Sequence, residues 1–251
     1  MAGSVDMFDI VLSFDTTGSM SSCIGSVKQR MGEIMKKLKK DIPGIRMGVI
    51  AHGDYDTDHT YIIEYENLTD NVERLCQFVS SARGTGGGHM GNLDEAYELA
   101  LQYARQRMNW RANSNRVLVM IGDCRPHEKN YPLNKERIDW NQEIVMLRDM
   151  GVKINAVQCD GREYADSFYQ KIASTTFGHH VPLYDIKKIE QVLMSICYRE
   201  TGLGATFFLN IGDREPDLKK ESNYINTIEG SFHVSSHLSE VSSLTESAQD
   251  T

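Results

Sequence analysis

The sequence has few cysteines, and their spacing does not indicate a covalent or metal-bound framework. The 251 residues include five cysteines, which are widely spaced and form no CxxC motif. An odd count at these spacings argues against a disulfide framework and against a cysteine-rich zinc site. We therefore expect reduced, buried thiols in a cytoplasmic protein. The cysteines are Cys23, Cys76, Cys124, Cys159 and Cys197.

Long apolar runs and clustered positive charge are also scarce. No apolar run approaches the roughly 20 residues that cross a bilayer, and the N-terminus has no basic start followed by an apolar core, so we expect no signal peptide. The net charge of −8 argues against nucleic acid or an anionic membrane as the main partner, because both favour clustered Lys and Arg. The one basic cluster, residues 36–40, ends a predicted helix, where cations suit the helix dipole.

Motifs typical of enzymes are absent or misplaced. Gly86, Gly88 and Gly91 match GxGxxG, but a predicted helix precedes them where a dinucleotide site needs a strand, and no GK[ST] follows. No HExxH zinc motif occurs. Since no base is paired with an evident nucleophile, the sequence does not predict an enzyme.

What the sequence does contain is an alternation of short apolar strands with amphipathic helices. This order predicts a doubly wound α/β fold: a mostly parallel, six-stranded sheet with helices on both faces. The predicted strands are 7–15, 45–54, 61–66, 116–123, 152–159 and 181–185. The predicted helices are 17–38, 70–83, 93–108, 136–150, 163–175 and 187–200.

The pattern fades towards the C-terminus. We expect one domain over residues 1–202, followed by a polar tail over 203–251 that is rich in Ser and Glu and partly disordered. One segment of this tail, near 206–211, contains enough apolar residues to dock.

Polar side chains gather where two predicted strands end. Asp15, Thr17 and Ser19 follow the first strand at spacings of two, and Asp123 ends the strand 116–123. Ligands of parallel sheets bind at the carboxyl ends of the strands, and hard cations such as Mg²⁺ prefer oxygen ligands. Asp15 and Ser19 are also good helix caps, so the spacing alone leaves both interpretations open.

These residues resemble a known signature. Asp15-x-Thr17-x-Ser19 is similar to the D-x-[ST]-x-S motif that begins the metal-ion-dependent adhesion site (MIDAS) of von Willebrand factor A (VWA) domains. The stretches DTTGSM, GVIAHGDYD, FVSSARGTGGG and VLVMIGDCRPHE follow in order. Together they resemble the VWA domains attached to atypical alpha-kinases and their intracellular relatives, over about residues 6–202.

The resemblance implies a bound Mg²⁺ or Mn²⁺. The family takes a further ligand, often Thr, from the loop before the third helix, and the Gly-rich loop 84–94 departs from that pattern. Asn92 and Asp94 are oxygen donors close to the predicted start of the helix; either could be a ligand, and either could equally cap the helix. The ligands that the resemblance implies are Asp15, Thr17, Ser19 and Asp123.

The function that this resemblance implies is protein binding, in which an acidic side chain of a partner completes the coordination of the ion. Asp54, His89 and His127 are expected at the rim of the site. Two alternatives remain. One is a metal-dependent hydrolase or kinase-accessory domain, with His127 near the ion. The other is a metal-free scaffold with a degenerate site, because loop 84–94 is irregular.

Overall fold

The first strand is apolar along most of its length because neighbouring layers cover both of its faces. In the computed structural model, which describes residues 7–56, 60–86 and 93–203, β1 (Met7–Asp15) lies at the centre of a sheet. Its side chains Ile10, Val11, Leu12 and Phe14 are each at most 1% exposed. A strand buried on both faces of a parallel sheet requires such an apolar run.

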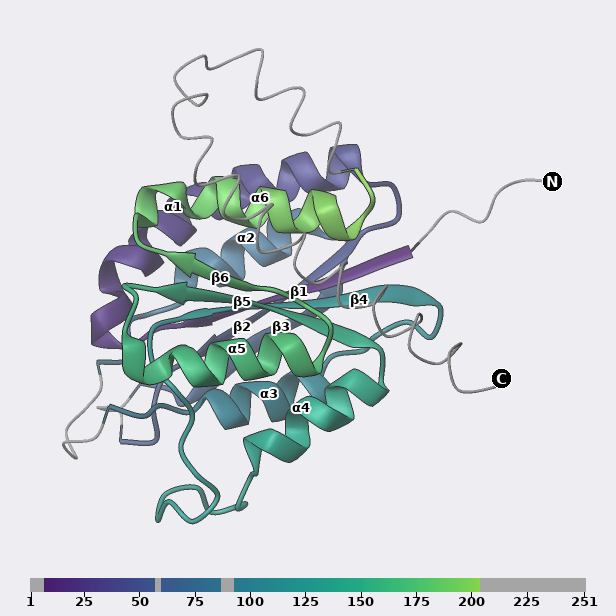
Figure 1. Cartoon of the computed structure of the whole chain (residues 1–251). Helices are drawn as coiled ribbons and strands as arrows, with labels where there is room; N and C mark the ends of the chain where they lie inside the picture. Colours follow the sequence, from purple (N-terminus) through teal and green to yellow (C-terminus); the bar gives the residue numbers. More distant parts are fainter. Residues whose placement is uncertain (1–6, 57–59, 87–92, 204–251) are drawn as a thin grey trace, which may run out of the picture. The chain divides into compact units, whose positions relative to one another are not determined.

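The sheet has six strands in the order β3-β2-β1-β4-β5-β6 (Figure 1). Every pairing is parallel except that of β2 with β3, which forms an antiparallel edge. The predicted fold class and the edge position of the third strand are therefore confirmed. The strands after β1 are β2 (Arg46–His52), β3 (Ile63–Thr69), β4 (Ser114–Gly122), β5 (Val152–Cys159) and β6 (His180–Leu183).

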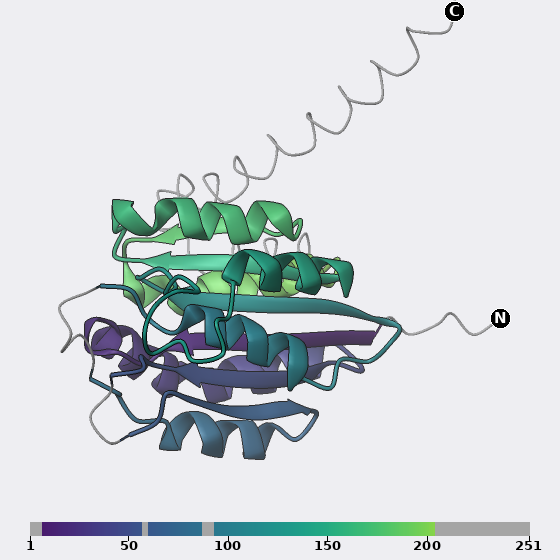
Figure 2. The ribbon, with the colours of Figure 1, turned by 90° about the horizontal axis from the view of Figure 1, so that it is seen from below.

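Helices cover both faces of the sheet. Helices α1, α2 and α6 pack on one face and α3, α4 and α5 on the other (Figure 1), and Figure 2 shows α3 and α4 in front of the strands. No helix in the described part of the chain is long and apolar enough to cross a membrane. The helices are α1 (Ser21–Asp41), α2 (Val72–Ser81), α3 (Tyr97–Gln106), α4 (Trp140–Asp149), α5 (Asp166–Thr175) and α6 (Ile189–Glu200). The single turns of 3-10 helix in the described residues are η1 (Gly18–Met20), η2 (Glu163–Ala165) and η3 (Ile186–Lys188).

The third helix begins later than the sequence predicts. Periodicity placed its start at residue 93, but α3 starts at Tyr97. Glu95 instead forms a bridge with Pro126, in which its backbone N–H donates to Arg125 O at 2.9 Å. This pairing takes up the N–H and fixes the chain in an extended course, so the first helical turn cannot form until Tyr97.

Two other helix starts differ for local reasons. The helix predicted from residue 136 begins at Trp140, because the Asn134 side chain bonds both backbone groups of Ile138 and holds a turn before it. Asp139 then caps α4 by accepting from Asn141 N. The helix predicted from residue 17 is first a 3-10 turn and becomes α-helical at Ser21.

The chain divides into two units, Met1–Gly204 and Ala205–Thr251. The second unit, which contains most of the predicted polar tail and its segment near 206–211, lies outside the described residues. The features discussed below therefore belong to the first unit.

Candidate metal centre

Strand β1 delivers a buried carboxylate to the carboxyl edge of the sheet. Asp15 is fully buried, and its carboxylate accepts from Thr17 N at 2.7 Å and from the Tyr97 hydroxyl at 2.8 Å. The bond to Thr17 N turns the chain sharply after the strand. The turn brings Thr17 Oγ1 within 3.3 Å of Ser19 Oγ, which donates to Asp123 Oδ1 at 3.2 Å.

The alternative that these side chains cap the first helix is not what the structure shows. The N-cap residues are Thr17 for η1 and Met20 for α1, and neither helix has a side-chain cap bond. Instead, Ser19 donates to Asp123, and Asp15 lies in the same cluster of carboxylates as Asp123.

The second predicted aspartate follows β4 and meets the first across the sheet edge. Because β1 and β4 pair in parallel, with Phe14 opposite Ile121, Asp123 leaves its strand beside Asp15. Asp123 is fully buried. Its Oδ2 lies 3.0 Å from Arg162 Nη2, an ion pair by distance that lacks the geometry of a hydrogen bond.

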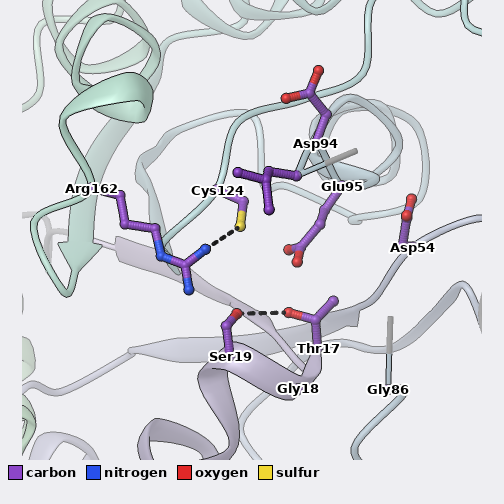
Figure 3. A pocket seen from close by; sticks show the side chains of 10 residues that line it. Thr17, Gly18, Ser19, Asp54, Gly86, Asp94, Glu95, Cys124 and Arg162 are labelled. Atoms are coloured by element: carbon purple, nitrogen blue, oxygen red, sulfur yellow. Dashed lines mark hydrogen bonds between the residues drawn. The ribbon is translucent and has the colours of Figure 1, made fainter. Parts of the chain in front are cut away.

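A third carboxyl group, Glu95, completes the cluster, and the sequence prediction missed it. One carboxylate oxygen each from Asp15, Glu95 and Asp123, together with Cys124 Sγ, lie within 4.8 Å of one another. Figure 3 shows the Glu95 carboxylate pointing toward Thr17. A helix predicted from residue 93 put Glu95 in the first turn, where acidic residues are common. The one signal was its place directly after the Gly-rich loop.

The electrostatics of the cluster favour a cation. Burial raises the pKa of Glu95, and the charge of Asp15 raises it further. Burial and the charge of Asp15 also raise the pKa of Asp123. Among the described residues, Glu95 Oε2 and Asp123 Oδ2 have no hydrogen-bond partner. A buried acceptor without a hydrogen bond costs about 1–3 kcal/mol, and Arg162 compensates for this only at Asp123. These residues therefore fit a divalent cation, which would neutralise the crowded carboxylates.

The donor set is mainly hard. The carboxylates and the two hydroxyls of Thr17 and Ser19 are oxygen donors of the kind that Mg²⁺ and Mn²⁺ prefer. Cys124 is the exception, but burial raises the pKa of its thiol, and the protonated sulfur donates to Asp123 Oδ1 at 3.2 Å. In this state Cys124 orients a carboxylate.

The site opens to solvent through a pocket of about 220 Å³ (Figure 3). Gly18 and Gly86 line the pocket with backbone alone. The Gly18 N–H donates to Gly86 O at 2.9 Å and so joins the two segments. The apolar side chain of Leu93 lines the pocket and is 62% exposed. The other lining residues are Thr17, Ser19, Asp54, Asp94, Glu95, Cys124 and Arg162.

Two residues predicted at the rim are buried and contact each other. Asp54 and His127 are each 2% exposed, and Asp54 Oδ1 meets His127 Nε2 at 2.6 Å. The His127 ring stacks on Tyr131 at 3.8 Å, and its backbone N–H donates to Glu98 Oε2. Asp54 still lines the pocket, whereas His127 supports the loop that follows Asp123.

The remaining predicted residues come from loop 84–94. Asp94 lies on the rim, where its carboxylate accepts from Arg125 Nε at 2.7 Å, and it is not part of the carboxylate cluster. Asn92 and His89 lie outside the described residues.

Tyr97, at the start of α3, holds the two aspartates in place. Its hydroxyl donates to Asp15 Oδ2 and accepts from Asp123 N at 3.1 Å, and Tyr169 donates to it at 3.2 Å. Gly122 makes this approach possible, since a Cβ atom there would lie 1.8 Å from the Tyr97 oxygen.

We expect Tyr97→Phe to weaken Mn²⁺ binding on the order of 10-fold, because residues that orient metal ligands have effects of this size. Titration calorimetry measures the affinity, and circular dichroism checks the fold. Tyr169→Phe is the matched control, since it removes a buried hydroxyl that touches Tyr97 but neither aspartate. Equal Mn²⁺ affinities for the two variants would show that Tyr97 does not position the site.

Comparison with known proteins agrees with this geometry. The model of the von Willebrand factor type A domain matches residues 9–194. Alpha-protein kinase vwkA of Dictyostelium discoideum is 31% identical over 125 residues, which are 49% of this chain and 19% of that protein. The chain thus corresponds to a small part of that kinase.

A solved structure shows the same fold. The open conformation of the pilus adhesin SpaC from Lactobacillus rhamnosus GG aligns with a TM-score of 0.58 and 13% identity, over 78% of this chain and 30% of the adhesin chain. The resemblance predicted from the motifs is confirmed by the family match and by the kinase relative. The chain belongs to the von Willebrand factor type A domain family.

Proposed function

We propose that this chain is a protein-binding domain that depends on Mg²⁺ or Mn²⁺. The observation that carries the proposal is the buried cluster of Asp15, Glu95 and Asp123, in which Glu95 lines the pocket and its Oε2 has no hydrogen-bond partner among the described residues. Domains of this family mediate protein–protein interactions and commonly bind divalent metals.

Each residue of the site has a distinct task in this proposal. Asp15 and Asp123 supply negative charge from adjacent strands, and Thr17 and Ser19 supply neutral oxygens from the turn after β1. A bound ion would supply positive charge at the floor of the pocket. The pocket that Thr17 and Ser19 line is open to solvent, so an acidic side chain of a partner can enter it. The attraction of that side chain to the ion would give selectivity.

The hydrolase alternative has less support. His127, the candidate base, is 2% exposed and is engaged by Asp54. A kinase-accessory role is compatible with the proposal, because the relative named alpha-protein kinase vwkA contains a matching segment.

Selection from a random peptide library tests the proposed function. We expect peptides captured by the Mn²⁺-loaded protein to be enriched in Asp and Glu, because a negatively charged carboxylate is the peptide oxygen ligand that the ion attracts most strongly. Capture should disappear when EDTA removes the metal and should fail on an Asp15→Asn variant. Peptides that bind equally well in EDTA would contradict metal-dependent recognition.

A further inference from the structure

Glu95 differs from the other carboxylates in how it reaches the site. It comes from the loop before α3, and its backbone is fixed on both sides: its N–H donates to Arg125 O, and its carbonyl accepts from His127 N at 3.2 Å. The residue is 9% exposed, and its Oε2 has no hydrogen-bond partner among the described residues. These backbone hydrogen bonds therefore hold the buried Glu95 carboxyl group in the cluster.

The charge of the cluster changes what an ion would attract. With Asp15 and Asp123 alone, a divalent cation would be neutralised by two carboxylates, and Arg162 beside Asp123 would leave the site net positive. Glu95 adds a third negative charge and removes that excess. An incoming carboxylate would then meet a neutral site that already contains a carboxylate of this chain.

We propose that Glu95 is an intrinsic ligand that competes with the partner's carboxylate for the ion; this inference rests on the proposed function. It tightens metal binding in the free domain and weakens the attraction for acidic partners. An acidic side chain gains access to the ion by displacing the Glu95 oxygen. The domain therefore holds its metal without a partner and selects partners that out-compete an internal glutamate.

Glu95→Gln tests this competition, because it removes the charge and keeps the shape. We expect Mn²⁺ affinity, measured by calorimetry, to fall on the order of 10-fold. Acetate serves as the carboxylate probe on protein saturated with Mn²⁺, and water proton relaxation reports its displacement of metal-bound water. We expect acetate to act at about 10-fold lower concentration in the variant.

Two further variants keep the outcome readable. Asp160→Asn removes an equal charge from an exposed residue that does not line the pocket and has a φ of 58°, which asparagine tolerates, and it should change both quantities less than about 3-fold. Glu95→Asp keeps the charge but shortens the side chain, so it should also bind Mn²⁺ more weakly. If Glu95→Gln does not fold, the Mn²⁺ affinity of Glu95→Asp shows whether Glu95 is a ligand.

The results separate the two proposals. Unchanged Mn²⁺ affinity in Glu95→Gln, or acetate acting at the same concentration as in the unmodified chain, overturns the role of Glu95. If Mn²⁺ binding does not depend on Asp15, the proposed function fails and the competition fails with it.

Discussion

Asp15→Asn should abolish Mg²⁺ and Mn²⁺ binding and leave the fold intact. The carboxylate is fully buried, but an asparagine oxygen can still accept from Thr17 N, and the amide can donate to the Tyr97 oxygen when the Tyr97 proton turns to Tyr169. The variant loses only the negative charge, and it also relieves repulsion with Glu95 and Asp123. Because even residues that orient metal ligands cost 10- to 100-fold in affinity, we expect a loss of more than about 100-fold.

Calorimetric titration of metal-stripped protein measures this loss, and thermal unfolding in EDTA checks stability. We expect the midpoint of unfolding without metal to stay the same or rise, because three crowded carboxyl groups become two. If the Asp15→Asn protein kept its Mn²⁺ affinity, the metal would not bind at the predicted site. Lost affinity together with lost circular dichroism would count only as misfolding.

Asp9→Asn, on the same strand, should have the opposite effects. Asp9 is fully buried at the other end of β1, where it accepts from Arg46 at 3.0 and 2.9 Å, from Arg111 and from Ser114. Asparagine cannot satisfy two guanidinium groups. We expect the free energy of unfolding to fall by about 3 kcal/mol, as for other broken buried ion pairs, with Mn²⁺ affinity unchanged.

The pH dependence of the Asp9 effect follows from the pKa of this carboxyl group. Burial would raise the pKa, but the bonds from Arg46, Arg111 and Ser114 outweigh it, and the net shift is downward from 3.8. A carboxyl group with a lowered pKa stabilises the fold above its unfolded value and loses this contribution as the pH falls through its folded value. The difference in unfolding free energy between the unmodified chain and Asp9→Asn should be full at neutral pH and shrink below about pH 3.8.

Urea unfolding of both proteins in EDTA, at neutral and acidic pH, measures this difference. Keeping metal out ensures that the change reflects the amino end of the sheet and not the candidate metal centre. A difference that persisted at low pH would show that Asp9 acts through packing and not through its charge.

The sequence predicted the architecture because local patterns determine it. The apolar run 116–123 and its counterpart 7–15 become central strands, and helices alternate with them on both faces. Asp15 and Asp123 were predicted together because parallel neighbours end at the same edge. Each of these inferences needs only local spacing and the general rules of parallel sheets.

The parts that were missed depend on contacts distant in sequence. Glu95 enters the cluster through its bridge with Pro126, and no local pattern records that pairing. Arg162 reaches Asp123 from the turn after β5. His127 lies in the loop between β4 and α4, where the sequence has no helical or strand periodicity. Its burial against Asp54 could therefore not be predicted from residue spacing.

Anomalous diffraction from crystals grown with Mn²⁺ would locate the ion directly. We expect a single strong peak in the pocket, within coordination distance of Asp15 and Asp123 oxygens and beside the hydroxyls of Thr17 and Ser19. Crystals that show no peak in this pocket, at a Mn²⁺ concentration that saturates the calorimetric signal, would contradict a metal centre at this edge of the sheet.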